Sequence, residues 1–283
     1  MLFLIASDYD KLAAARPHVT VEAEYGDTVV SGSLYTFAHH GSRSHNPAPC
    51  TLSNLTDLDS DTIVGLSHVD LDTIGGCAAV LGFKTGSDSF WALAEFMDLN
   101  GAHKLGESGA SAEDIRAIRA YWAFGDSSKV WAPRDGSVLD VTDSILEHVS
   151  TINAILAGNT ELLDAGDVWA LKRCQLGLDT YRFSNYGVIF RESVSFVNDL
   201  YQDGADVAKA VVAFNDEQGS VTLSFADKGT GNACEIVQGL WGPDAGGHKG
   251  IAGSPRDKVL TMADASDCYN AVCEMVRERF LKG

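Results

Sequence analysis

The chain has 283 residues, 45% of them hydrophobic, and its 39 acidic against 21 basic residues give a formal net charge of −18. This length suits two domains and this composition fills ordinary cores, which excludes a disordered or fibrous protein. The negative charge would repel a long polyanion, so extended nucleic acid is excluded as a partner, whereas a short nucleotide accompanied by cations is compatible with it.

Membrane and disulfide-stabilised proteins are also excluded. The sequence contains no run of about eighteen apolar residues, and its opening MLFLIA lacks the basic start and the length of a signal peptide. We therefore expect a cytoplasmic protein with no membrane partner. The six cysteines include no C-x-x-C pair, which indicates reduced thiols in apolar surroundings.

The chain begins with segments that predict strands. An apolar run over residues 2–6 predicts a buried strand, followed by Asp8 and Asp10, which can be helix caps or metal ligands. Residues 19–24 and 28–37 predict two extended segments separated by a turn.

A histidine-rich loop follows these strands. Within seven residues it contains His39, His40, Arg43 and His45, and it ends in a turn-forming Asn-Pro sequence. Imidazole and guanidinium groups at this density can bind a metal or a phosphate.

The central stretch predicts a metal-binding cluster at a strand end. Residues 62–66 predict a buried strand, after which His68, Asp70 and Asp72 alternate with apolar residues. In an extended segment this alternation directs the three side chains to one side. Two carboxylates and an imidazole suit a divalent metal, which would neutralise the repulsion between the carboxylates. The alternative is a surface histidine beside two helix-capping aspartates.

A small-residue helix over residues 74–81 is expected next. Its glycines Gly75 and Gly76 would let the chain approach a phosphate or metal closely.

A further helix is predicted over residues 89–97. Asp98 and His103 follow it, either as a second pair of metal ligands or as a capped, solvated corner. Periodic apolar residues predict more helices over residues 112–124, 141–157 and 162–177.

The C-terminal part predicts a hairpin between residues 208–215 and 220–226, then helices around 232–240 and 267–280. Between these helices lies the glycine-rich sequence DAGGHKGIAGSP, residues 244–255. Exposed backbone N–H groups in such a turn can hold a phosphate or a base edge, and His248 adds a donor. The alternative is a tight turn between two elements.

The glycine-rich segment resembles the GGH-x-x-A-A-G signature of the DHH-associated domain. Together with the His-x-Asp-x-Asp cluster about 175 residues earlier, it makes the chain similar to the DHH phosphoesterase superfamily. The resemblance implies an α/β protein with a parallel-sheet metal-binding domain, residues 1–186, and a smaller α/β substrate-binding domain, residues 187–283, with the site in the cleft between them.

Two features depart from the family pattern. Residues 38–40, Ala-His-His, resemble the Asp-His-His motif with alanine in place of aspartate, and they precede the His/Asp cluster instead of following it. A circular permutation, with residues 2–40 supplying strands that usually come later, would explain the order. Asp8 or Asp10 would then stand for the family's middle aspartate.

The resemblance implies hydrolysis of a phosphodiester or phosphomonoester of a small nucleotide or short oligonucleotide, with two divalent ions, expected to be Mn²⁺, with Mg²⁺ or Co²⁺ as alternatives. A homodimer is compatible with it. The residues that it assigns to metal binding are His40, His68, Asp70 and Asp72, to which the loop after residue 97 adds Asp98 and His103 as the second ligand pair. The residues expected to act in catalysis are His39, His40 and Asp72, and those expected to bind substrate are Arg43, Gly246, Gly247 and His248.

Two other functions stay open at this point. One is a degenerate member that binds a nucleotide without cleaving it, which Ala38 favours. The other is a metal-dependent hydrolase of a different ester or amide.

Overall fold

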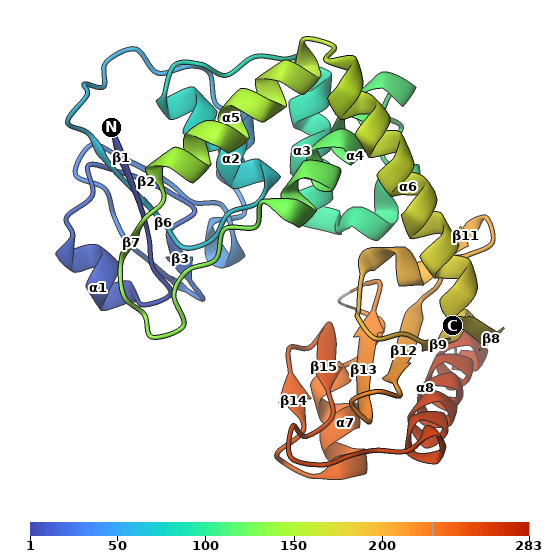
Figure 1. Cartoon of the computed structure of the whole chain (residues 1–283). Coiled ribbons are helices and arrows are strands. Elements are labelled where there is room, and N and C mark those ends of the chain that lie inside the picture. The colour runs from blue at the N-terminus through green and yellow to red at the C-terminus, as the bar shows by residue number, and fades with distance from the viewer. Residues whose placement is uncertain (228, 283) are drawn as a thin grey trace. The chain divides into compact units, whose positions relative to one another are not determined.

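The computed structural model in Figure 1 describes residues 1–227 and 229–282. The chain divides into two compact units, one made of residues 1–100 and 107–170, the other of residues 101–106 and 171–283. The division falls inside the long helix α6 (Thr160–Thr180), earlier in the chain than the expected boundary at residues 186 and 187.

The N-terminal unit contains a five-stranded sheet with the strand order β5-β2-β6-β1-β7. Four neighbouring strands are parallel, and only the edge strand β7 runs antiparallel, beside β1. The strands are β1 (Leu2–Ile5), β2 (Val19–Val21), β5 (Tyr35–Phe37), β6 (Ile63–Leu66) and β7 (Leu139–Asp140), and a separate ribbon is formed by β3 (Glu24–Tyr25) and β4 (Thr28–Val29).

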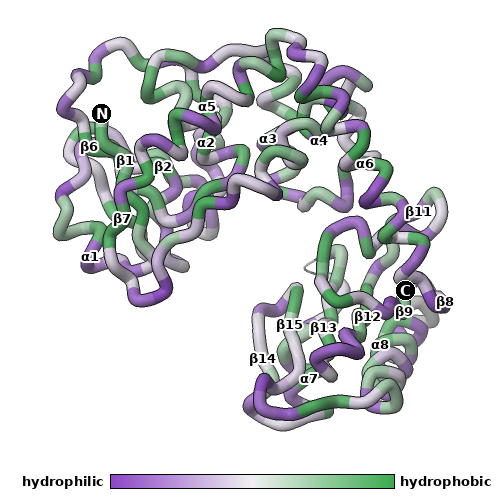
Figure 2. The backbone as a smooth tube through the Cα atoms, in the orientation of Figure 1, coloured by the Kyte–Doolittle hydropathy of each residue, from purple (hydrophilic) through white to green (hydrophobic). Residues whose placement is uncertain are grey.

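The central strands form because short apolar runs can be buried on both faces of a parallel sheet. Phe3, Ile5, Val64 and Leu66 are all fully buried. In Figure 2 these strands belong to the hydrophobic stretches of the backbone tube.

Six helices complete the N-terminal unit or lead out of it: α1 (Tyr9–Ala14), α2 (Leu71–Val80), α3 (Asp88–Asn100), α4 (Ala112–Ser127), α5 (Thr142–Leu156) and α6. Every residue of α2 is buried. This helix packs against α3, α5 and β2, so its first turn is fixed relative to the sheet.

The C-terminal unit contains a six-stranded sheet with the order β14-β15-β13-β12-β9-β8. Its strands are β8 (Tyr181–Asn185), β9 (Val188–Glu192), β12 (Ala210–Asn215), β13 (Ser220–Phe225), β14 (Gly246–Gly247) and β15 (Ile251–Gly253). The helices α7 (Ala233–Trp241) and α8 (Met262–Lys282) supply apolar side chains to the same core as the sheet, and β10 (Gln202–Asp203) pairs with β11 (Asp206–Val207).

The expected α/β class with a parallel N-terminal sheet is confirmed, and the predicted hairpin is the pair β12 and β13. β9, just after the expected boundary, lies beside β12 in the sheet. Its apolar run is only three residues long, so the strand depends on its parallel partner. Within the described residues, no helix is both long enough and apolar enough to cross a bilayer.

Candidate metal centre

The candidate centre lies where three adjacent parallel strands end. Glu22 follows β2, His39 and His40 follow β5, and His68 follows β6. Parallel strands all end at one edge of their sheet, which is where open α/β sheets bind ligands. The sheet order therefore brings together side chains that are up to 46 positions apart in the sequence (68 minus 22).

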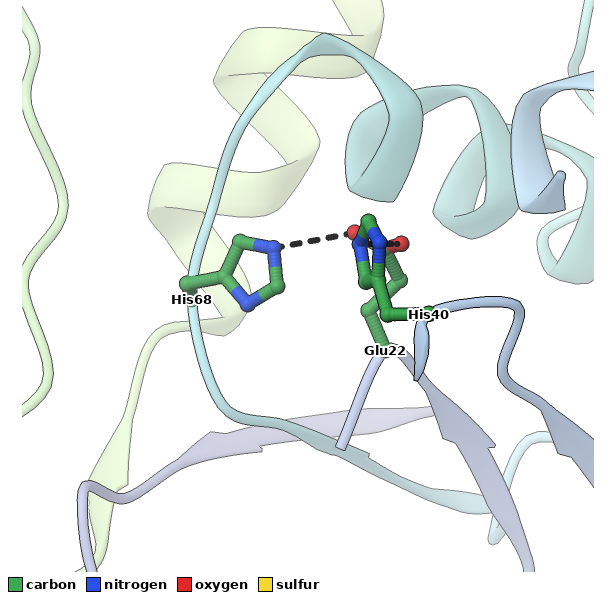
Figure 3. Close-up of side chains that lie close together, drawn as sticks. All are labelled: Glu22, His40 and His68. Atoms are coloured by element: carbon green, nitrogen blue, oxygen red, sulfur yellow. Dashed lines mark ion pairs between the residues drawn. The ribbon is translucent and has the colours of Figure 1, made fainter. Parts of the chain in front are cut away.

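Glu22 is the residue that sequence analysis did not select. Its side chain is fully buried, and Figure 3 shows it in contact with His40 and His68. Its backbone has a φ of 49°, in the left-handed region that a side chain larger than glycine occupies only at a cost of roughly 1–3 kcal/mol. Its N–H donates to Phe37 O at 2.8 Å and its carbonyl accepts from the Ser67 hydroxyl, and these bonds hold the kink.

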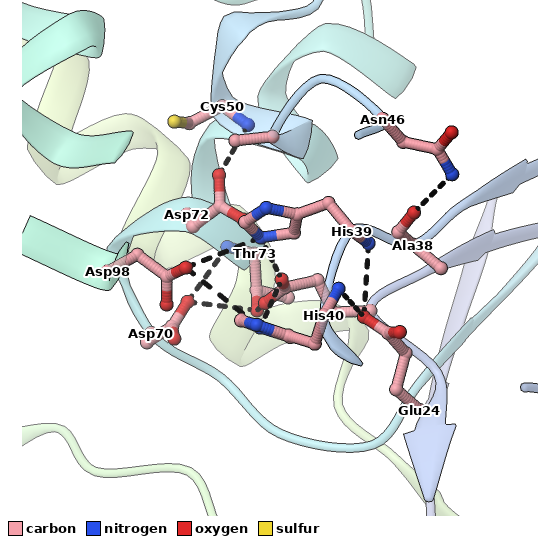
Figure 4. A network of polar contacts seen from close by, with 12 residues as sticks. Glu24, Ala38, His39, His40, Asn46, Cys50, Asp70, Asp72, Thr73 and Asp98 are labelled. Carbon is pink, nitrogen blue, oxygen red and sulfur yellow. Dashed lines mark hydrogen bonds and ion pairs between the residues drawn. The ribbon is translucent and has the colours of Figure 1, made fainter. Parts of the chain in front are cut away.

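Three carboxylate oxygens surround one nitrogen of His39. Nε2 lies 2.9 Å from Glu22 Oε1, 3.0 Å from Asp72 Oδ2 and 3.4 Å from Asp98 Oδ2. This nitrogen carries at most one proton and can donate to one acceptor only. A single N–H does not satisfy three carboxylates, so the geometry calls for more positive charge than the histidine provides (Figure 4).

The second oxygen of Glu22 extends the cluster towards solvent. His68 Nε2 lies 3.0 Å from Glu22 Oε2 and 3.5 Å from Asp70 Oδ2, while His40 Nε2 lies 3.0 Å from Glu22 Oε1. The side chains of His40, His68 and Asp70 are 38%, 42% and 41% exposed, whereas Glu22 is 0% exposed. The centre thus has a buried half and a half that a solute can reach.

The two central aspartates owe their positions to the start of α2. Asp70 is the N-cap of this helix, where its Oδ1 accepts from Thr73 N at 2.9 Å, so the capping alternative holds for Asp70. Asp72 lies inside the first turn. The expected alternation along an extended segment was therefore wrong, because α2 begins at Leu71, and it is the helix turn that directs both carboxylates to the histidines.

Gly75 and Gly76 permit close packing of two chain segments. A Cβ on Gly75 would lie 2.5 Å from Cys50 Cβ, and one on Gly76 would lie 2.7 Å from Pro49 Cβ. Both belong to the 3-10 turn Pro49–Thr51, whose Cys50 N–H donates to Asp72 Oδ1 at 2.7 Å. We expected these glycines to let a phosphate or metal approach the chain closely. The segment that packs closely against them is instead the turn that orients Asp72.

The charges in the cluster perturb one another strongly. Burial raises the pKa of Asp72 and of Asp98 to about 6, and the negative charge of Glu22 adds to both rises. Burial acts to lower the pKa of His39 and of His68, but the neighbouring carboxylates outweigh it and raise both to about 10. Burial opposes ionisation of Glu22 as well, yet its contacts with the histidines hold its pKa well below the usual range.

The residues present fit divalent metal ions. Glu22 Oε1, His39 Nε2, Asp72 Oδ2 and Asp98 Oδ2 are buried, and among the described residues the three oxygens lie 2.9–3.4 Å from His39 Nε2 without the geometry of a satisfied hydrogen bond. The possible ligand atoms of the centre form three overlapping groups, and within each group all of these atoms lie within 4.8 Å of one another. The groups are Glu22, His40 and His68; His39, His40 and Asp98; and Glu22, His39 and Asp72. A mixed set of carboxylate oxygens and imidazole nitrogens suits Mn²⁺ and similar ions.

The Arg43 guanidinium contacts a carboxylate and two backbone carbonyls. Its Nε and one terminal nitrogen lie 2.9 and 2.7 Å from Glu24 Oε1, and the guanidinium also donates to the carbonyls of Asp27 and Gly26 at 3.1 and 3.4 Å. The expected pairing of Arg43 with phosphate would compete with these acceptors, which already contact all three guanidinium nitrogens.

His103 is directed elsewhere than expected. α3 ends at Asn100, and after Gly101, with φ of 89°, the chain turns so that the His103 ring stacks on Tyr201 with the ring centres 4.5 Å apart. Its Nε2 lies 3.1 Å from Ala226 O. Among the described residues, His103 belongs to none of the three ligand groups, whereas Asp98 does.

The aspartates of the permutation hypothesis are also outside these groups. Asp8 accepts from Lys11 N at 3.0 Å as the cap of α1, which is its structural alternative, and Asp10 lies exposed in that helix. The carboxylate that the cluster gains in their place is Glu22.

The glycine-rich segment of the C-terminal unit forms a tight antiparallel pair. His248 N donates to Ile251 O at 2.7 Å, and a Cβ on Gly247 would lie 2.5 Å from that same carbonyl oxygen. Strand pairing thus accounts for Gly247. Gly246 has open space where a Cβ would be, and His248 is exposed, so both are accessible to a solute.

No protein-family model and no curated protein matches the chain. Among solved structures, the chain is similar to the pGpG-specific phosphodiesterase PggH from Vibrio cholerae, with 10% sequence identity, 97% of this chain and 98% of that chain covered, and a TM-score of 0.44.

Proposed function

We propose that the N-terminal unit is the catalytic unit of a metal-dependent phosphoesterase that hydrolyses a phosphodiester or phosphomonoester of a small nucleotide or short oligonucleotide. The observation that carries the proposal is His39 Nε2, which is buried within 3.4 Å of three carboxylate oxygens. Such a concentration of negative charge is stable when cations neutralise it.

Two neighbouring cation positions share Glu22. Glu22, His39, Asp72 and Asp98 would hold one ion in the buried half, and Glu22, His40, His68 and Asp70 would hold the other in the accessible half. Paired metal sites with a shared carboxylate are typical of phosphatases and nucleases, and we propose Mn²⁺ as the ion. When bound, such ions lower the pKa of water and stabilise charge on phosphoryl oxygens.

The protein residues provide orientation and access. Cys50 N–H fixes one oxygen of Asp72, which leaves the other aimed at His39. The Ser67 hydroxyl lies 2.9 Å from His68 Nδ1, which directs the opposite nitrogen, Nε2, to Glu22. The phosphate of a substrate would enter beside the partly exposed His40 and His68, since Glu22, His39 and Asp72 in the other half of the cluster are buried.

A role in binding the nucleotide is also proposed for the C-terminal unit. The exposed residues Gly246 and His248 are the ones we propose for it, in keeping with the resemblance of this segment to a substrate-binding turn. A small substrate also accords with the net charge of −18, which disfavours a long polyanion.

The proposal is tested by incubating the purified full chain with Mn²⁺ and phosphoester probes. Bis-p-nitrophenyl phosphate, linear dinucleotides, cyclic dinucleotides and p-nitrophenyl phosphate separate diester from monoester hydrolysis. Turnover that needs Mn²⁺ and stops with EDTA is expected. Mn²⁺ binding without turnover of any probe would favour the degenerate nucleotide-binding alternative, and the absence of Mn²⁺ binding would refute the metal centre.

The affinity for Mn²⁺ should increase with pH. Without metal, His39 and His68 keep their protons at neutral pH because the carboxylates raise their pKa to about 10. A metal ligand must lose its proton, so each displaced proton should increase the apparent affinity about tenfold per pH unit below that value. Below pH 6, protonation of Asp72 and Asp98 should weaken binding further.

Calorimetric titration between pH 5.5 and 8, in buffers of different ionisation enthalpy, measures both the affinity and the protons released. An affinity that does not depend on pH would contradict protonated histidine ligands.

A further inference from the structure

The backbone N–H groups of His39 and His40 are bound by Glu24, an acidic residue that belongs to none of the three ligand groups. Glu24 Oε2 accepts from the backbone N–H groups of His39 and His40 at 3.2 and 3.3 Å, as Figure 4 shows. Both bonds end on the same carboxylate oxygen. They therefore fix the orientation of two consecutive peptide groups whose side chains face the cluster.

The other oxygen of Glu24 is fixed by Arg43. The guanidinium contacts Oε1 from two nitrogens, at 2.9 and 2.7 Å, and is itself held by the carbonyls of Gly26 and Asp27. The Glu24 side chain is only 5% exposed and that of Arg43 18% exposed. A charge-assisted contact of this kind is stronger than one between neutral groups, and partial burial limits its screening by salt.

The pairing of Glu24 with Arg43 also affects the charge beside the cluster. Glu24 would add another carboxylate to the side of an already acidic cluster, but Arg43 neutralises it and occupies one of its oxygens, while the histidine N–H groups occupy the other. Glu24 can consequently position the histidines without competing as a ligand. On the other side of the segment, the Asn46 side chain donates to Ala38 O at 2.8 Å, so the loop is held from two directions.

We infer that Glu24 is a positioning residue of the metal centre, and that Arg43 keeps its carboxylate in place. The inference rests on the proposed function, because it concerns the same centre. Glu24 acts through the backbone of His39 and His40, so that their Nε2 atoms meet Glu22 Oε1 at 2.9 and 3.0 Å. Residues that orient metal ligands in this way typically change metal affinity by about 10- to 100-fold when they are removed.

The test is calorimetric titration of the full chain with Mn²⁺ alone. Glu24→Ala is expected to lower the Mn²⁺ affinity about 10- to 100-fold, and Arg43→Ala to lower it by a smaller factor, because Glu24 can still accept from the histidine N–H groups. The matched control is Glu192→Ala, which breaks a similar ion pair, that with Arg182 at 2.8 Å, in the C-terminal unit. This control should bind Mn²⁺ like the wild type.

A merely structural role predicts a different result. Glu24→Ala would then lower the melting temperature of the metal-free protein while the folded protein bound Mn²⁺ with wild-type affinity, which would overturn the inference. If Glu24→Ala does not fold by circular dichroism, Glu24→Asp decides: its shorter side chain keeps the charge beside Arg43 but withdraws the oxygen that accepts from the histidine N–H groups, so wild-type affinity there would equally overturn the inference. A wild-type chain that binds no Mn²⁺ refutes the proposed function itself, and the positioning role with it.

Discussion

Glu22→Gln is expected to abolish metal-dependent hydrolysis. Glu22 is the residue shared by both proposed cation positions, and glutamine keeps its shape but removes its charge and one of its two ligand oxygens. Several kcal/mol of transition-state stabilisation depend on bound metal, so turnover should fall by about 10³-fold or more. The measurement is the initial rate of Mn²⁺-dependent hydrolysis, together with the Mn²⁺ stoichiometry from calorimetry.

The fold of this variant should survive, because the glutamine oxygen can accept the hydrogen bond that Thr73 Oγ1 now donates to Glu22 Oε2 at 2.9 Å. Glu147→Gln, an exposed position on α5, is the matched control and should keep wild-type turnover. Wild-type turnover of a folded Glu22→Gln protein would remove Glu22 from the centre and leave the shared-carboxylate arrangement without support.

Asp72→Asn should lower metal-dependent hydrolysis but raise the stability of the metal-free protein. We expect hydrolysis to fall by about 10³-fold, since the ions lose a buried carboxylate, while the metal-free protein becomes more stable above pH 6. Burial raises the pKa of Asp72 to about 6, so the charged form is disfavoured in the folded state and its ionisation destabilises the native protein as pH rises through that value. Asparagine removes the charge and keeps an acceptor for Cys50 N–H.

Denaturant unfolding of the metal-free proteins at pH 5 and pH 8 checks this sign: the gain of the variant should be larger at pH 8. The companion variant Asp70→Ala should also lose hydrolysis but should be less stable, by about 0.5–2 kcal/mol, because Asp70 caps α2. Turnover near the wild-type value in both Asp70→Ala and Asp72→Asn would refute the assigned centre.

The orientation of Asp72 can be perturbed without touching it. Gly75→Ala places a Cβ 2.5 Å from Cys50 Cβ and 2.6 Å from the Trp91 ring, so the turn that donates to Asp72 must shift, at a cost of about 1–3 kcal/mol. We expect weaker Mn²⁺ binding as well as lower stability. Gly125→Ala, a helical glycine with open space around its Cβ, is the control and should be neutral or stabilising.

Local patterns in the sequence were sufficient to predict most elements. Apolar runs identified β1 and β6, periodic apolar residues identified α3 to α6, and the turn sequence between β12 and β13 identified their hairpin. These features depend on near neighbours in the chain, so that local propensity and burial decide them. The same patterns marked His39, His40, His68, Asp70, Asp72 and Asp98, because polar residues with ligand atoms directly after strands or helices are visible in a sequence.

Three features were decided only by tertiary structure. Glu22 carries no local signal beyond its place after a short strand, and it becomes a shared carboxylate because β2 lies between β5 and β6 in the parallel sheet. The sequence around Arg43 suggests a side chain available to phosphate, but in the folded chain its guanidinium pairs with Glu24 of β3. His103 pairs with Asp98 by spacing, but the turn after α3 directs it to Tyr201.

The sequence by itself therefore determined which chemical groups are available and which elements carry most of them, because hydrophobic periodicity and turn chemistry act over a few residues. Only the tertiary structure decided which of these groups converge on one point. The order of parallel strands is set by packing between distant segments, as with β2 beside β6 and Gly75 against Cys50, and no residue's immediate neighbours encode that order.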